Sequence, residues 1–199
     1  VDATLKELRK LRSGQDTLHF QNRYRCKDGS WRWLAWSTPA SNEEGILYAV
    51  AKDITERKIF EDQLMRQAKF DYLTGLPNRG YLDDELERAM ARARRGQHVL
   101  AGFFIDLDDF REVNARHGLE LGDDLLRQMA MRLRTLLRAN DFVARIGGDE
   151  FFVLAELAQY AKTLHLAEKI AAVLQHPFLM EDGQLQITAS VGVMPYKPE

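Results

Sequence analysis

The segment RIGGDEFF, Arg145–Phe152, places two glycines and two acids between two apolar stretches, DFVARI before it and FFVLAEL after it. A Gly-Gly pair followed by acids is common in a tight hairpin turn, where glycine adopts backbone angles that other residues avoid. The same residues also suit a binding site, because glycines let a phosphate approach the backbone and carboxylates hold metal ions. The rest of the chain decides between a plain turn and a site.

A second group of acids ends an apolar run upstream. Residues 99–107, VLAGFFIDL, predict a strand that is buried on both faces, with Asp106 where it ends. An unpaired carboxylate beside apolar groups costs on the order of several kcal/mol, and a divalent cation shared with Asp149 and Glu150 would remove that cost. Carboxylate and carbonyl oxygens are the ligands that Mg²⁺ prefers. The alternative is that Asp106 caps a helix beginning at Leu107.

Polar side chains of another kind follow this strand. Asn114 and Asp123 lie eight and seventeen residues after Asp106, with Gly118 and Gly122 between them. An amide and a carboxylate together can read the hydrogen-bonding edge of guanine, which offers both donors and acceptors. Asp123 could equally be the N-cap of the helix that starts with DDLLRQM, and the two roles are compatible.

The region from 70 to 199 reads as alternating helices and strands. DDELERAMARARR predicts a helix with acids in its first turn, and LLRQMAMRLRTLLR predicts a long helix with one apolar face. DFVARI and EFFVLAEL predict strands, LAQYAKTLHLAEKIAAVLQ a helix, and FLMEDGQLQITASVGVM a hairpin around Asp182-Gly183. The order βααββαββ indicates an α+β fold of ferredoxin-like type, whose partly antiparallel sheet is covered by helices on one face.

The first 56 residues have a different pattern. A short helix with Leu5, Leu8 and Leu11 ends at Ser13-Gly14, and three alternating strands follow, separated by the turns KDGS and NEEG. We therefore expect three parts: 1–56, a linker helix 57–69, and 70–199. The apolar spacing of the linker fits a plain amphipathic helix or the stalk of a parallel dimer equally well.

Composition limits the classes of function. The chain has 199 residues and a net charge of −2, so it lacks the basic field that holds nucleic acid, and we expect no nucleic-acid partner. The arginines of RAMARARRG are interpreted as the solvated face of a helix. Cys26 is the single cysteine, which excludes an internal disulfide. With neither a signal peptide nor a membrane-spanning run, a cytoplasmic location is expected, and a membrane segment outside this chain stays an open alternative.

Four motifs in order, FDYLTGLPNR, FFIDLDDFREVN, GLELGDDLL and ARIGGDEFFVL, resemble the GGDEF domain, the diguanylate cyclase family, over roughly residues 68–194. That family joins two GTP molecules into cyclic di-GMP, and its fold is similar to nucleotide cyclases. YRCKDGSWRWLAW and GILYAVAKDITERK resemble the end of a PAS domain over about fifty residues. The resemblance implies a cyclase preceded by the C-terminal part of a PAS sensor and a linker helix.

The same resemblance implies a metal site for Mg²⁺ or Mn²⁺. Its ligands would be the carboxylates of Asp106 and Asp149 and the backbone carbonyl of Leu107. Glu150 would join this cluster or assist in deprotonating the attacking hydroxyl. Asp149 and Glu150 are thus the expected catalytic residues.

The nucleotide contacts implied by the resemblance lie around these acids. Asn114 and Asp123 would recognise guanine, Arg111 would take the place of a lysine beside the phosphates, and Gly147 and Gly148 would give the nucleotide room. Each domain would bind one GTP. Two domains must then face each other, so a homodimer is expected for catalysis.

RAND, Arg138–Asp141, resembles the RxxD inhibitory site of the family. Arg138 would bind the phosphates or guanine of cyclic di-GMP and Asp141 would accept from the base, so that the product inhibits the enzyme. A helix-terminal arginine followed by a turn aspartate is the simpler reading. The alternative function is a catalytically silent GTP-binding module that regulates an adjacent phosphodiesterase domain.

Overall fold

The computed structural model describes residues 2–13, 15–38, 48–96, 98–180 and 183–196. The chain divides into two compact units, residues 1–65 and 66–199, each with its own internal contacts. Among the described residues, no helix combines the length and the apolar character that crossing a bilayer requires.

The N-terminal unit is one helix and a three-stranded antiparallel sheet in the order β1-β2-β3. Its elements are α1 (Asp2–Arg12), β1 (Thr17–Arg25), β2 (Trp31–Thr38) and β3 (Val50–Asp53). The predicted helix and the turn before Trp31 are confirmed, with Gly29 in the left-handed region at φ 86°. The expected NEEG turn, and Gly14 of the helix stop, lie outside the described residues.

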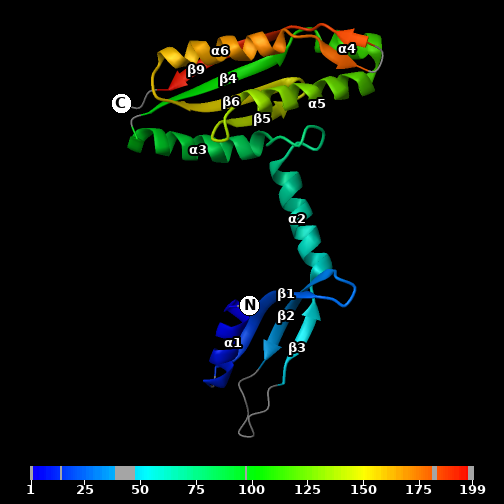
Figure 1. The fold of residues 1–199 in the computed structure, drawn as a ribbon, viewed down its shortest axis with the longest axis vertical. Helices are drawn as coiled ribbons and strands as arrows, with labels where there is room; N and C mark the ends of the chain where they lie inside the picture. The colour runs from blue at the N-terminus through cyan, green and yellow to red at the C-terminus, as the bar shows by residue number, and fades with distance from the viewer. Residues whose placement is uncertain (1, 14, 39–47, 97, 181–182, 197–199) are drawn as a thin grey trace. The chain divides into compact units, whose positions relative to one another are not determined.

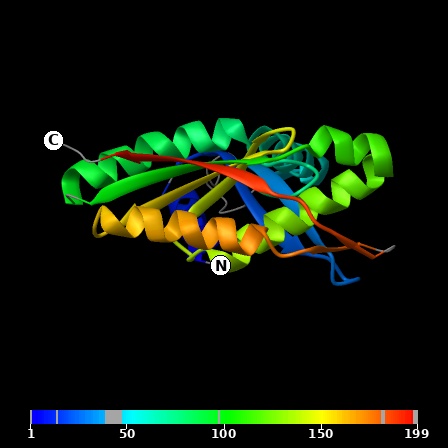
Figure 2. The ribbon, with the colours of Figure 1, turned by 90° about the horizontal axis from the view of Figure 1, so that it is seen from above.

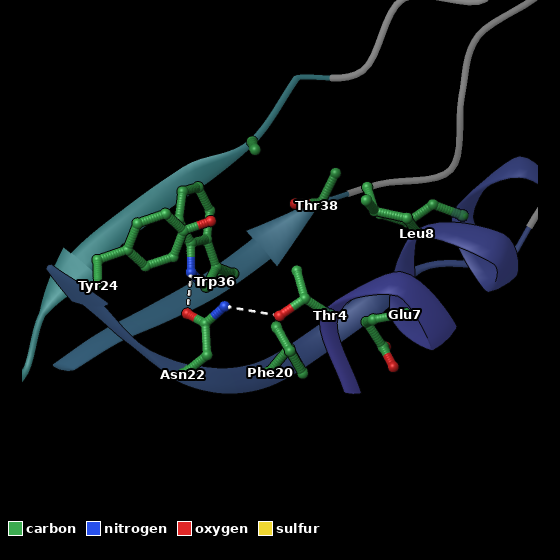
Figure 3. Close-up of a pocket in the computed structure, with 10 residues that line it drawn as sticks. Thr4, Glu7, Leu8, Phe20, Asn22, Tyr24, Trp36 and Thr38 are labelled. Atoms are coloured by element: carbon green, nitrogen blue, oxygen red, sulfur yellow. Dashed lines mark hydrogen bonds between the residues drawn. The ribbon is translucent and has the colours of Figure 1, made fainter. Parts of the chain in front are cut away.

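A cavity of about 160 Å³ lies between α1 and strands β1 and β2. Figure 3 shows the amide of Asn22 between its two partners: it accepts a hydrogen bond from Trp36 Nε1 at 2.9 Å and donates to Thr4 Oγ1 at 3.2 Å. The amide therefore links α1 to the sheet across the cavity, and its polar groups are satisfied within the protein.

The linker helix α2 (Thr55–Lys69) begins two residues earlier than predicted. The carboxylate of Asp53 accepts the hydroxyl and backbone N–H of Thr55, and it pairs with Arg32 at 2.6 Å. These contacts, the Thr55 hydroxyl first, lower the pKa of Asp53 to about 2. No described residue of α2 is buried, and Ile59, Phe60, Leu64 and Met65 are about half exposed or more. The choice between a plain linker and a dimer stalk stays open.

The C-terminal unit is built on a four-stranded sheet in the order β5-β6-β4-β9, with every neighbouring pair antiparallel. This is the strand order of a ferredoxin-like fold. Its elements are α3 (Arg79–Gly96), β4 (Val99–Leu107), α4 (Phe110–His117), α5 (Leu119–Leu136), β5 (Phe142–Gly147), β6 (Glu150–Leu157), α6 (Ala161–Leu174), β7 (Phe178–Met180), β8 (Gly183–Leu185) and β9 (Ala189–Tyr196).

Helices lie on both faces of this sheet, so the predicted one-sided cover is wrong. Figures 1 and 2 both place the strands between α3 and α6. Alternate residues of each strand divide between two cores: Phe103 and Phe151 pack toward α5 and α6, whereas Leu100 and Phe152 pack toward α3. The α3 face is only partly covered, because Phe104 on this face stays 48% exposed.

Three local expectations are corrected. Helix α3 begins at Arg79, ahead of the predicted DDELE start, so its first turn holds no acid. The segment predicted as one last hairpin divides in two. Strands β7 and β8 pair with each other, whereas β9 pairs with β4 in the main sheet. Asp182 of the expected turn lies outside the described residues. The length of β9 reflects its eight-residue register with β4, which a local turn signal does not reveal.

Two exposed arginines of α3 are held by neighbouring acids. Arg92 contacts Glu85 at 2.8 Å and Glu156 at 2.7 Å, and Arg88 contacts Glu85 at 3.6 Å. This agrees with the interpretation of RAMARARRG as a solvated helix face.

Candidate active site

The segment RIGGDEFF, Arg145–Phe152, contains a two-residue hairpin turn. Gly147 pairs with Glu150, so Gly148 and Asp149 form the turn between β5 and β6. Gly148 has φ 42°, a left-handed value that favours glycine at the first turn position. The turn interpretation is therefore confirmed, and the turn also sets Asp149 and Glu150 at the end of the sheet.

The two acidic groups meet across the sheet. Asp106 is directly opposite Glu150 in the β4–β6 pair and opposite Ser190 in the β4–β9 pair. Although Asp106 is exposed, a loss of hydration beside its neighbours, followed by repulsion from Asp149, Glu150 and Asp108, raises its pKa above the ordinary value. Like charges directly opposite one another on a sheet destabilise it. The fold accepts this repulsion at the end of the sheet, where β4 ends and β6 begins after the turn.

The helix-cap interpretation of Asp106 is wrong. Strand β4 continues to Leu107, which is buried, and the next helix begins at Phe110 with Asp109 as its N-cap residue. Asp108 turns to the neighbouring strand instead, where its carboxylate accepts hydrogen bonds from Thr188 and Ser190. Asp106 is left facing Glu150 as the strand ends.

The three acids suit a divalent cation, but they would supply only some of its ligands. Asp106, Asp149 and Glu150 supply carboxylate oxygens whose mutual repulsion a cation would relieve. Across the described parts of the chain, no three Asp, Glu, His or Cys side chains converge closely enough to hold a metal ion alone. Further oxygen atoms, such as the Leu107 carbonyl and the phosphates of a bound nucleotide, would have to complete the coordination.

A polar atom without a partner lies between α4 and α5. The side-chain oxygen of Asn114 is buried and has no hydrogen-bond partner among the described residues. It lies against Gly122: a Cβ at that position would come within 1.9 Å of Asn114 Oδ1 and 3.3 Å of Phe110 Cζ. Such a buried acceptor costs free energy unless a donor reaches it.

Asp123 follows Gly122 within the helix. The expectation that Asp123 is an N-cap is wrong, because α5 begins at Leu119 and Gly118 is the cap residue. Asn114 lies on helix α4, and Gly118 at φ 88° separates the two helices. Arg111, in the first turn of α4, is exposed. The α4–α5 corner thus carries the three side chains that the sequence assigned to the nucleotide.

Arg145, for which the sequence predicted no role, supports the hairpin. Arg145 donates to the carbonyl oxygen of Gly148 through Nε at 2.9 Å and through a terminal nitrogen at 2.6 Å. Its other terminal nitrogen contacts Asp71 Oδ1 at 3.0 Å, where the Thr74 backbone and hydroxyl also donate. Both ion-pair side chains are largely buried. The guanidinium therefore ties the turn between β5 and β6 to the FDYLTGLPNR segment.

The signal for this contact was partly present in the sequence. Asp71 belongs to one quoted motif and Arg145 to another, but they are 74 residues apart, and spacing alone pairs no residues at that distance. Burial by itself would raise the pKa of Asp71, yet the hydrogen bonds from Thr74 and Arg145 outweigh it and lower that pKa below 3.8.

We expect Asp71→Asn to lower the free energy of unfolding by about 2 kcal/mol at pH 7, because a partly buried charged hydrogen bond is lost. A carboxyl with a lowered folded-state pKa stabilises the protein above its unfolded pKa and loses this effect as pH falls through the folded value. The difference between variant and wild type should therefore shrink below pH 3.8. Urea unfolding at pH 7 and pH 3 measures this, and an equal difference at both would contradict the assignment.

Arg138 and Asp141 lie before the other end of β5. Asp141 Oδ2 accepts the backbone N–H of Arg138 at 3.0 Å, and the backbone N–H of Asp141 donates to the Arg138 carbonyl at 3.0 Å. The turn interpretation of Asp141 is thereby confirmed. Both residues also line a cavity of about 290 Å³, so the turn does not preclude binding.

A family model described as diguanylate cyclase, GGDEF domain, matches residues 68–199. The chain belongs to this family. Diguanylate cyclase TpbB of Pseudomonas aeruginosa is 44% identical over 135 residues, which cover 67% of this chain and 31% of that protein. The bifunctional diguanylate cyclase/cyclic di-GMP phosphodiesterase MucR of the same organism is 42% identical over 134 residues, covering 67% of this chain and 20% of that protein.

Solved GGDEF domains share the fold of the C-terminal unit. The isolated GGDEF domain of TpbB from P. aeruginosa is 43% identical with a TM-score of 0.62, covering 64% of this chain and 75% of that one. The coiled coil and GGDEF domain of DgcB from Caulobacter crescentus, solved with c-di-GMP, is 28% identical with a TM-score of 0.65, covering 73% of this chain and 78% of that one. The chain spans less than a third of the length of the curated relatives TpbB and MucR.

Proposed function

We propose that the C-terminal unit is a diguanylate cyclase that condenses two GTP molecules into cyclic di-GMP and pyrophosphate. The observation that carries this proposal is the meeting of Asp106 with Glu150 across two paired strands, beside the turn residue Asp149. The amide of Asn114 and the carboxylate of Asp123, on adjoining helices, are groups of the kind that recognise guanine. Membership of the GGDEF family agrees with this activity.

The residues that would hold Mg²⁺ or Mn²⁺ are Asp106, Asp149, Glu150 and the carbonyl of Leu107. When bound, the cation would activate the attacking hydroxyl and neutralise charge on the phosphates. In each half-reaction a 3′-hydroxyl oxygen forms a bond to the α-phosphorus of the other GTP, and pyrophosphate leaves with the electrons of the broken P–O bond. The proton of the hydroxyl would pass to a base, and Glu150 is the candidate in this chain.

The remaining site residues bind and orient the nucleotide in this proposal. The carboxylate of Asp123 would accept hydrogen bonds from the N–H groups of guanine, the amide of Asn114 would pair with its hydrogen-bonding edge, and the guanidinium of Arg111 would contact phosphate oxygens. Gly147 and Gly148 would let phosphates approach the turn, since neither position has a side chain there. Arg145 would keep the turn in place through the Gly148 carbonyl.

Catalysis between two nucleotides, each on its own domain, requires a homodimer. The exposed apolar side chains of α2, Ile59, Phe60, Leu64 and Met65, offer a surface that a second copy of the helix could cover. The N-terminal helix and three-stranded sheet agree with the C-terminal part of a PAS sensor, which would then control the cyclase through α2.

The experiment that tests the proposal is incubation of the full chain with GTP and Mg²⁺, followed by separation of the nucleotides. Formation of cyclic di-GMP and pyrophosphate supports the enzyme. Binding of GTP without either product would instead indicate the silent GTP-binding module. The complete set of carboxylates and the names of the relatives favour the enzyme.

Product feedback is part of the proposal. Arg138 and Asp141 line a cavity away from the hairpin turn, and a guanidinium binds phosphate or the guanine edge bidentately. We expect Arg138→Ala to abolish inhibition by cyclic di-GMP while the initial rate with GTP stays near that of the wild type. Rates measured against increasing cyclic di-GMP test this. Inhibition curves that coincide with those of the wild type would remove the assignment.

A further inference from the structure

The cavity beside Arg138 has a second guanidinium in its wall. Arg134, in the last turn of α5, lines the same cavity of about 290 Å³ together with Arg138 and Asp141. Of the residues that line this cavity, the family resemblance assigns a role only to Arg138 and Asp141. Arg134 lies one helical turn before that motif and is exposed.

Neither of these two arginines is neutralised within the described part of the chain, since no salt bridge involves either guanidinium there. Arg92, Arg116 and Arg145, by contrast, each contact a carboxylate at 3.0 Å or less. Among the described residues that line the cavity, Asp141 carries the one carboxylate, and its Oδ2 already accepts the backbone N–H of Arg138. Two positive groups therefore share one cavity with a single carboxylate.

Apolar side chains complete the cavity. Leu137, Phe142 and Val143 line it, and Phe142 is an aromatic residue against which a base can lie. The volume is close to the lower limit of small-molecule pockets, so the cavity suits part of a dinucleotide. A positive pair beside an apolar wall matches a ligand that carries phosphates next to bases.

We propose that Arg134 is a further binding residue of this site and contacts a phosphate of the bound cyclic dinucleotide, while Arg138 contacts the other phosphate or the guanine edge. This inference rests on the proposed function, because it takes cyclic di-GMP as the ligand. Two guanidinium groups bind a ligand with two phosphates more tightly than one guanidinium does, since each forms a bidentate, charge-assisted pair. Arg134 thereby contributes to the affinity and to the preference for a ligand with two phosphates.

The test is calorimetric binding of cyclic di-GMP to the full chain, without metal or GTP, for Arg134→Ala, Arg134→Lys and Arg138→Ala. We expect Arg134→Ala to weaken binding by about tenfold to a hundredfold, as loss of a charge-assisted hydrogen bond does. Arg134→Lys should recover part of this affinity, because lysine keeps the charge without the planar fork. Arg95→Ala, an exposed arginine in the last turn of α3, is the matched control and should bind as the wild type does.

The outcomes separate this inference from the proposal on which it rests. Weak binding by Arg138→Ala together with wild-type binding by Arg134→Ala would overturn the role of Arg134 alone. Wild-type binding by both variants would overturn the product site itself. A loss in Arg134→Ala accompanied by an equal loss in Arg95→Ala would reduce the effect to general charge, and would likewise overturn the specific contact.

Discussion

An Asp149→Asn variant should form cyclic di-GMP at least about 10³-fold more slowly than the wild type, and Asp106→Asn should do the same. Each substitution removes a charged oxygen from the group of acids that the β4–β6 register brings together. Metal-assisted stabilisation of the transition state contributes several kcal/mol, and each 1.36 kcal/mol corresponds to a factor of about ten in rate. Initial rates of pyrophosphate release at saturating GTP and Mg²⁺ measure the effect.

The matched control for these variants is Asp108→Asn. Asp108 is two residues from Asp106, but its carboxylate is held by hydrogen bonds from Thr188 and Ser190. This variant should lose stability and keep most of its activity. Asp106→Asn should have the reverse profile, with a melting temperature without metal no lower than that of the wild type, because it removes repulsion from its neighbours. Near-normal turnover by Asp106→Asn or Asp149→Asn would show that these carboxylates belong only to the strand end and the turn.

Gly122→Ala should raise the KM for GTP on the order of a hundredfold. The added Cβ would come within 1.9 Å of Asn114 Oδ1, so the amide has to leave its position or the α4–α5 packing has to open. Either movement withdraws the acceptor assigned to guanine, and each 1.4 kcal/mol of lost binding is a factor of about ten in affinity. Binding of GTP and of ATP should be measured side by side, since the preference for guanine should fall together with the affinity.

The control for this variant is Gly80→Ala. Gly80 is also helical, but a Cβ there would meet its nearest atom, Asn78 Oδ1, at an ordinary 3.5 Å. It should fold and bind GTP as the wild type does, since alanine is favoured over glycine in a helix. If Gly122→Ala retains wild-type affinity for GTP and a wild-type melting temperature, Asn114 is not held against Gly122 as the structure has it, and the guanine site must lie elsewhere.

Local patterns in the sequence were sufficient for many elements of the fold. The 3.6-residue spacing of leucines predicted α1, and alternation predicted β1 and β2, because these periods match the side-chain geometry of a helix and of a strand. The hairpin turn at Gly148 was also predictable, since its left-handed backbone favours glycine. These features depend on residues close together in the chain.

Features that depend on distant residues were not predictable. The apolar run of β4 is compatible with helices on one face or on both, and α3 covers the second face through contacts such as Leu82 with the strands. Asp106 and Glu150 are 44 residues apart, so their opposition depends on the β4–β6 register, which neither segment determines alone. The ion pair of Asp71 with Arg145 has the same origin.

The α4–α5 corner shows a third limit on what the sequence alone can predict. The sequence assigned Asn114 and Asp123 to guanine through a resemblance, and the structure places them on adjoining helices. The sequence predicted no role for Gly122. Glycine is needed there because the Asn114 amide occupies the space that a side chain would take. Their roles toward GTP stay predictions.

The most direct test of the central claim is the anomalous scattering of Mn²⁺ in crystals of the full chain grown with a non-hydrolysable GTP analogue. We expect an anomalous peak between the carboxylate of Asp106 and the Asp149–Glu150 end of the hairpin, with phosphate oxygens on its open side. A nucleotide bound with no cation between these acids, or a cation held by other residues, would contradict the account.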